Sequence, residues 1–127
     1  MYGIYVQTTR AIDYAISLVK GYKRIETRTR DVFKNMDKRD PVAIIRTGRG
    51  RKPEIVGFVL LMPGYHCPAE RFQDFFQYHF VQPGSKFDTD ERGKWFYEVY
   101  DPVALETPIE LPKEHINHGR SYTEFTL

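Results

Sequence analysis

The spacing of hydrophobic and polar residues changes along the chain, and each spacing predicts a different kind of element. Short alternating runs, or runs of β-branched and aromatic residues, predict strands at 2–8, 24–28, 41–47, 54–62, 94–106 and 121–127. In two other segments apolar residues recur every three or four positions, which predicts helices at about 10–20 and at 68–80. Stretches that contain Gly, Pro or charged residues predict loops at 29–40, 48–53 and 82–93.

The sequence also predicts where the two helices begin and end. Thr8 or Thr9 is the expected N-cap of the first helix, and Gly21 suits the left-handed backbone that closes it. The apolar face that ends before this glycine consists of Ile12, Ala15, Ile16 and Val19. In the second helix Pro68 suits the first turn. Its aromatic stripe, which we expect to lie in the core, consists of Phe72, Phe75, Phe76 and Phe80.

Several short strands with two main helices inserted predict an α+β fold built on a small, mostly antiparallel β-barrel. Strands and helices do not alternate regularly, which excludes a parallel doubly wound sheet. A length of 127 residues with 41% apolar side chains is typical of one domain, so we expect residues 1–127 to share one core.

Charge is divided unequally along the chain, although the net charge is only +2. Residues 20–52 contain 12 Lys or Arg and 4 Asp or Glu, whereas residues 53–127 contain 6 and 12. A local excess of cations can steer and hold an anion. The alternative is a solvated surface that the acidic second half balances in three dimensions.

The densest part of the basic region is KGYKRIETRTR, residues 20–30. If 24–28 is a strand, Arg24, Glu26 and Arg28 share one face, with Lys23 beside them. The guanidinium groups can bind a phosphate, and an ionised Glu26 can accept from a base amino group or a sugar hydroxyl. The alternative is that Glu26 only forms an ion pair with its cationic neighbours.

The predicted hairpin tip at 48–53 is a second candidate for phosphate contacts. It carries Arg49, Arg51 and Lys52 between glycines that let another backbone approach closely. A basic tip that only improves solubility is an equally good interpretation. Candidates for stacking on a base are Tyr22, Tyr65 and Trp95, although a core position is the alternative for each.

Other kinds of chemistry have weaker support in the sequence. His115 and His118 have helical ligand spacing but lack a third ligand, so we expect no metal site. No P-loop or dinucleotide fingerprint is present, and we expect no cofactor. The lone Cys67 cannot form an internal disulfide, and no apolar run reaches the roughly 18 residues of a membrane span. We therefore expect a cytoplasmic protein that does not enter a membrane.

The segment YAISLVKGYKRIETR resembles the helix-Gly-x-Lys-x-x-Glu-x-Arg signature of ASCH domains, a branch of the PUA-like barrels. Gly21, Lys23, Glu26 and Arg28 fall on the motif positions. DPVAIIRT, IVGFV and WFYEVYDPVALETPI resemble later strands of these domains, so the resemblance extends over essentially the whole chain. It implies a small PUA-like barrel that binds RNA or a modified nucleoside in a cleft beside the barrel.

The resemblance also implies an alternative function, because some small ASCH proteins hydrolyse the acetyl amide of acetylated cytidine and others have been proposed as ribonucleases. The amidohydrolases use the motif lysine and a threonine three residues later. Lys23 matches the lysine, but Glu26 stands where the threonine would be, which removes the hydroxyl nucleophile. With Lys23 beside it, Glu26 could still act as a general base on water, so hydrolysis remains the alternative. A third possibility is a module that binds an acidic protein.

Overall fold

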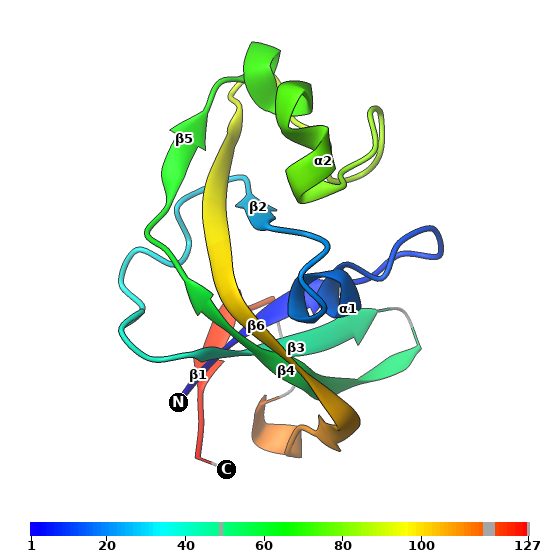
Figure 1. The fold of residues 1–127 in the computed structure, drawn as a ribbon, viewed down its shortest axis with the longest axis vertical. Helices are drawn as coiled ribbons and strands as arrows, with labels where there is room; N and C mark the ends of the chain where they lie inside the picture. Colours follow the sequence, from blue (N-terminus) through cyan, green and yellow to red (C-terminus); the bar gives the residue numbers. More distant parts are fainter. Residues whose placement is uncertain (49, 116–118, 127) are drawn as a thin grey trace.

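A curled, half-barrel sheet dominates the computed structural model, which describes residues 1–48, 50–115 and 119–126 (Figure 1). In the described residues the sheet follows the order β2-β6-β4-β3-β1-β7, and β5 pairs with β6 outside this path. The strands are β1 (Tyr2–Gln7), β2 (Ile25–Arg28), β3 (Val42–Gly48), β4 (Arg51–Leu61), β5 (Tyr65–Cys67), β6 (Lys94–Glu110) and β7 (Tyr122–Glu124). The α+β class predicted from the sequence is confirmed. The sheet is mixed, because β1 pairs with β3 in parallel while the other pairs are antiparallel.

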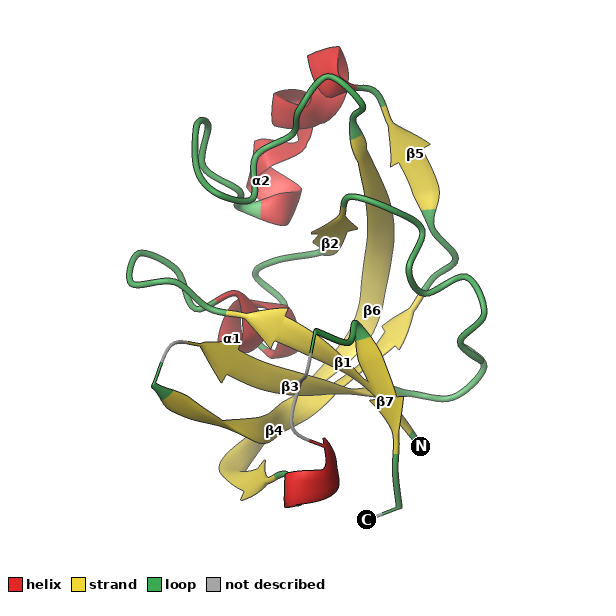
Figure 2. Ribbon diagram, turned by 180° about the vertical axis from the view of Figure 1, so that it is seen from behind, coloured by secondary structure: helices red, strands yellow, loops and turns green. Residues whose placement is uncertain are grey.

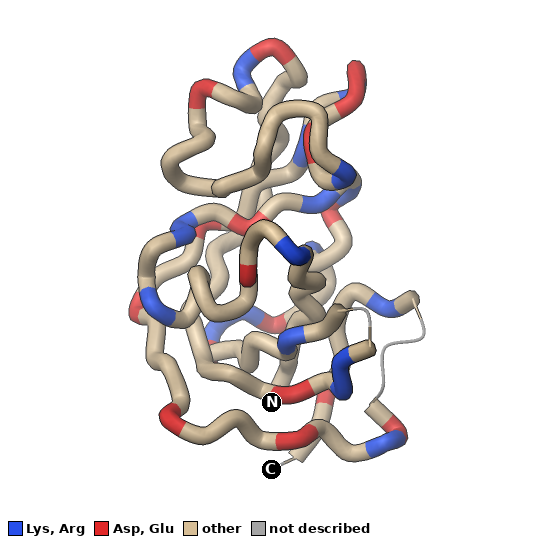
Figure 3. Tube along the Cα trace, turned by 90° about the vertical axis from the view of Figure 1, so that its right-hand side faces the viewer, with Lys and Arg blue, Asp and Glu red and all other residues tan. Residues whose placement is uncertain are grey.

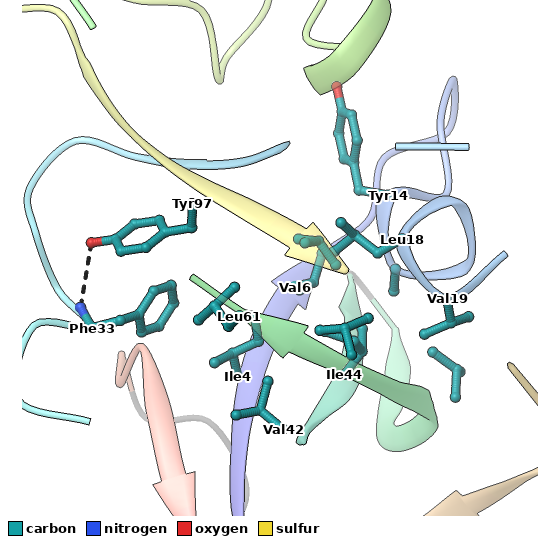
Figure 4. Close-up of a cluster of buried hydrophobic side chains, with 14 of the residues drawn as sticks. Ile4, Val6, Tyr14, Leu18, Val19, Phe33, Val42, Ile44, Leu61 and Tyr97 are labelled. Carbon is teal, nitrogen blue, oxygen red and sulfur yellow. Dashed lines mark hydrogen bonds between the residues drawn. The ribbon is translucent and has the colours of Figure 1, made fainter. Parts of the chain in front are cut away.

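The helix α1 (Tyr14–Val19) packs on the concave side of this sheet (Figure 1). Its buried residues join strand residues such as Ile4, Ile44 and Leu61 in the main hydrophobic core (Figure 4). Phe33 and Tyr97 close one end of that core, where their rings meet edge to face with centroids 4.9 Å apart. The loop 29–40 therefore contributes to the core although it has no regular structure.

The predicted N-cap of this helix is wrong. Asp13 caps α1, because its Oδ1 accepts a hydrogen bond of 3.0 Å from the backbone N–H of Ile16. Thr9 instead makes its own turn, accepting from the N–H of Ile12 at 3.1 Å. The polar residues between β1 and α1 therefore form two consecutive turns, and only the second opens the helix.

The predicted end of α1 is confirmed. Gly21 has φ +80°, the left-handed conformation that favours glycine. The N–H groups of Tyr22 and Lys23 both donate to the carbonyl of Ser17, each at 3.0 Å. This closure turns the chain from α1 into β2 and places the basic motif at the junction.

The second helical segment differs from the prediction in its geometry. It is a 3₁₀-helix, η1 (Ala69–Phe75), followed by one α-turn, α2 (Phe76–His79), and Phe80 ends it at φ +63°. Because a 3₁₀-helix has three residues per turn, the buried stripe shifts away from the predicted one. Phe72 and His79 are fully buried and stack with ring centroids 4.2 Å apart, whereas Phe76 is exposed.

The 17-residue strand β6 connects the two parts of the sheet (Figure 2). Its first half pairs with β2 and β5, and its second half with β4. Gly57 of β4 lies where a Cβ would come within 2.2 Å of the carbonyl oxygen of Val103, so only glycine fits the crossing. No helix in the described residues is long and apolar enough to cross a membrane.

Candidate functional site

A cleft of about 300 Å³ opens beside β2, with walls from β1, α1, β2, β3, the start of β6, the loop before β6 and the segment before β7. Four cationic side chains and one carboxylate line it: Lys23, Arg28, Lys94, Arg120 and Glu26. The other lining residues are Tyr5, Val6, Gln7, Tyr14, Thr27, Thr29, Thr47, Val81, Phe87 and Ser121. The cleft therefore combines an excess of positive charge with hydroxyl groups and three aromatic rings.

Lys23 is buried at the base of this cleft, with 1% of its surface exposed. Its Nζ donates to the carbonyl of Ile25 at 2.7 Å and to that of His79 at 2.6 Å, and lies 3.3 Å from Glu26 Oε1. An ammonium group has three N–H donors, and these three acceptors match them. Burial lowers the pKa of Lys23, and the negative charge of Glu26 opposes that shift. Lys23 therefore positions Glu26 and joins β2 to the end of α2.

Glu26 is the one acidic side chain among the described residues that line the cleft, and its side chain is 5% exposed. Burial favours its neutral form, but Arg28 and then Lys23 outweigh burial and hold the pKa of Glu26 below its ordinary value. Arg28 Nη1 lies 2.8 Å from Oε2, yet it is aligned for hydrogen bonding with the carbonyl of Thr27 at 2.9 Å. Glu26 Oε2 consequently has charge compensation but no aligned donor among the described residues.

The backbone holds Arg28 in one orientation. Its Nη2 donates to the carbonyl of Tyr5 at 2.6 Å, and its guanidinium lies over the ring of Phe33, 5.1 Å from the centroid. About a fifth of the side chain is exposed. Because Arg28 is fixed by β1 and by the core, it can present its remaining N–H groups to a ligand without further ordering.

Lys94, which the sequence analysis missed, also lines the cleft and is 5% exposed. Its Nζ has no ion pair or hydrogen bond with any described residue. Burial and then the nearby Arg28 lower the pKa of Lys94. Lys94 precedes Trp95, which pairs with Arg28 across the β2–β6 ladder. The sequence shows Lys94 only as a lysine at the start of a hydrophobic strand. Its place in the cleft depends on the register between β2 and β6.

The other predicted basic residues do not line the cleft. Arg24 is exposed and lines a separate groove, although it neighbours Lys23 in sequence. At the β3–β4 hairpin, Arg51 lies 3.6 Å from Glu54 and Lys52 lies 3.6 Å from Glu110. Arg49 lies outside the described residues. Lys and Arg positions are interspersed with Asp and Glu positions in this view of the backbone, rather than gathered in separate halves (Figure 3).

None of the three predicted stacking residues lines the cleft. Tyr22 is 65% exposed, Tyr65 is 43% exposed, and Trp95 is half-buried against His66. Tyr14 and Phe87, which do line it, meet edge to face with centroids 5.8 Å apart. The sequence did not distinguish these two from the other aromatic residues of the chain.

No histidine or cysteine is among the described residues that line the cleft. Cys67 is buried, and burial raises the pKa of its thiol, which disfavours the nucleophilic thiolate. The ring of His115 is hydrogen-bonded with the hydroxyl of Thr123, 3.0 Å away. His118 lies outside the described residues, and within them no three His, Cys, Asp or Glu side chains come together as metal ligands.

The fold is similar to that of solved ASCH proteins from the bacterium Zymomonas mobilis. The ASCH protein itself superposes with a TM-score of 0.72 at 17% identity, covering 98% of this chain and 87% of that one. Two of its single-residue mutants give TM-scores of 0.71 at 16% and 17% identity, covering 98% of this chain and 88% and 90% of theirs. No protein-family model matches the sequence, and no curated protein sequence matches it significantly. From the extent of this superposition we conclude that the chain has an ASCH domain fold.

Proposed function

We propose that the protein binds RNA or a modified nucleotide, with a base and its phosphate in the cleft beside β2. The observation that carries this proposal is the buried Glu26, whose Oε2 lacks an aligned donor in a cleft that also holds four cationic side chains. Buried carboxylate oxygens usually accept hydrogen bonds, so an oxygen without one favours a ligand that supplies a donor.

The carboxylate selects the part of the ligand that enters the cleft. A phosphodiester group has no proton to donate to Glu26 and is repelled by it, whereas an exocyclic amino group of a base or a ribose hydroxyl can donate. We therefore assign the base or sugar to Glu26. This assignment also explains why an otherwise basic cleft contains one carboxylate held in its ionised form.

We assign the phosphate to the cationic side chains whose N–H donors are not already used within the protein. Lys23 is saturated by its three acceptors, so it does not serve this purpose. Lys94 has no partner among the described residues, and Arg120 also lines the cleft. The Lys94 residue is 5% exposed, and an anionic ligand in the cleft would give its ammonium group a direct ion-pair partner. Lys94 is therefore the proposed phosphate anchor.

Binding of labelled single-stranded RNA, single-stranded DNA and nucleoside monophosphates, measured by fluorescence anisotropy at several salt concentrations, tests the proposal. We expect Lys94→Met to weaken RNA binding roughly tenfold and to reduce the slope of log K against log salt by about 0.7. Lys34→Met is the matched control, because Lys34 is exposed and does not line the cleft. Equal affinity of the wild type, Lys94→Met and Lys34→Met for RNA would contradict the proposal.

The Glu26 assignment has its own test. Glu26→Gln replaces one acceptor oxygen by a donor, so it should weaken binding of nucleotides that offer an amino group to the carboxylate more than binding of inorganic phosphate. Circular dichroism checks that the variant is folded. Hydrolysis of acetylated cytidine and of RNA is followed in the same samples, and turnover that Glu26→Gln abolishes would favour the hydrolase alternative over simple binding.

A further inference from the structure

A second cavity, of about 310 Å³, lies beside the same edge of the sheet. We call it the aromatic groove, and its lining residues are Arg24, Ile25, Tyr65, Phe75, Tyr78, Glu98, Val99 and Tyr100. The strand β2 contributes to both cavities, because Ile25 faces the groove while Glu26 and Arg28 line the cleft. β2 ends the hydrogen-bonded path of the sheet, so both cavities are lined in part by an edge strand.

Aromatic rings are unusually exposed in this groove. Tyr65 and Tyr100 are 43% and 50% exposed, and Phe75 and Tyr78 lie beside them. Exposed aromatic rings that gather around a concave surface mark interaction sites more often than isolated ones do. The rings come from β5, η1, α2 and β6, so the fold brings together residues that are far apart in sequence.

Arg24 provides the charge of the groove. Its side chain is exposed, and the guanidinium forms no ion pair or hydrogen bond with any described residue. Arg24 directly follows Lys23, and consecutive Cα atoms are about 3.8 Å apart. The backbone of Arg24, which lines the groove, is therefore one peptide unit from that of Lys23, which lines the cleft.

We propose that the aromatic groove binds a second nucleotide of the same single-stranded RNA, which crosses β2 from the cleft. This proposal rests on the function proposed above. Single strands are held by aromatic rings that stack on bases and by cations that follow the backbone, and the groove has both. Tyr100 and Tyr65 would stack on the base, and Arg24 would contact the phosphate between the two nucleotides. Glu98, opposite Ile25 in the β2–β6 ladder, can accept from a base amino group or ribose hydroxyl.

The test compares a nucleoside monophosphate with RNA oligonucleotides of increasing length on the same protein. The wild type should gain affinity when the ligand is extended beyond one nucleotide. Tyr100→Ala and Arg24→Ala should each lose about tenfold in affinity for the oligonucleotide and bind the monophosphate as the wild type does. Both positions are exposed, so the substitutions should leave the fold intact. Tyr22→Ala is the matched control, because Tyr22 is exposed but lines neither cavity.

The possible results separate this inference from the proposed function. If the oligonucleotide binds no better than the monophosphate, or if Tyr100→Ala and Arg24→Ala bind it as the wild type does, the groove is not an RNA subsite and the cleft proposal stands. An equal loss of monophosphate binding in these variants also overturns the inference, because the groove would then not act separately. If the wild type binds neither ligand, both proposals fail.

Discussion

Replacing Lys23 by methionine tests the interpretation that this side chain holds the base of the cleft together. Methionine keeps the length and apolar character of the lysine stem but removes the ammonium group. In the variant the carbonyls of Ile25 and His79 lose their donor, and Glu26 keeps Arg28 as its one remaining ion-pair partner among the described residues. The substitution therefore leaves a buried carboxylate only partly compensated.

The expected loss in the free energy of unfolding follows from the burial of the Lys23–Glu26 ion pair. The side chains of Lys23 and Glu26 are 1% and 5% exposed, so solvent screens their interaction little. Breaking a buried pair by removing one partner costs about 3–5 kcal/mol. Arg28 still neutralises part of the charge, so we expect Lys23→Met to lower the free energy of unfolding by about 3–4 kcal/mol. This is a large part of the roughly 5–15 kcal/mol that stabilises a typical domain.

The assay is urea unfolding, followed by the fluorescence of the single tryptophan, Trp95, and by circular dichroism. Lys20→Met is the control, since Lys20 is exposed and should change stability by less than about 0.5 kcal/mol. The double variant Lys23→Met with Glu26→Leu should recover part of the loss, because it removes the uncompensated charge as well. A loss below about 1 kcal/mol in Lys23→Met, or no recovery in the double variant, would refute the reasoning.

Three further predictions concern the scaffold. His79 is buried and its pKa is lowered to about 4, chiefly by burial, so between pH 6.5 and 4 the unfolded chain binds more protons than the folded one. About 3 kcal/mol of stability should be lost as pH falls through this window. His79→Gln should flatten that part of the urea-midpoint profile, because its neutral amide offers a donor for the Phe72 carbonyl and an acceptor for the Val81 N–H in place of the ring nitrogens. Gly57→Ala should destabilise by more than about 2 kcal/mol in urea unfolding, because its Cβ would lie 2.2 Å from the oxygen of Val103; an unchanged midpoint would mean that the strand crossing relaxes freely. Asp13→Ala should cost about 1–2 kcal/mol and lower the melting temperature, since it removes the cap on Ile16 and the ion pair with Arg46; a melting temperature equal to that of the wild type would show that neither contact is needed.

Sequence patterns correctly predicted the secondary-structure elements that depend only on residues close together in the chain. Alternation located β2, two apolar runs around a glycine-containing tip located the β3–β4 hairpin, and Gly21 located the end of α1. Each of these signals depends only on neighbouring residues. The N-cap was mistaken because Thr9 and Asp13 are both good capping residues, and the choice depended on where α1 meets the sheet. The shift of the buried aromatic stripe from Phe76 to His79 has a similar cause, since apolar periodicity does not distinguish a 3₁₀-helix from an α-helix.

The sequence by itself determined the α+β class, most strand positions and the three residues of the motif that meet at the cleft. Lys23, Glu26 and Arg28 lie within six positions of one another, so the turn after α1 and the pleat of β2 suffice to bring them together. Only the tertiary structure decided that Arg24 faces a different cavity, that Lys94 joins the cleft and that two backbone carbonyls and Glu26 surround the Lys23 ammonium group. These facts depend on the β2–β6 register and on the packing of α2 against β2, which are set by contacts between residues far apart in the chain.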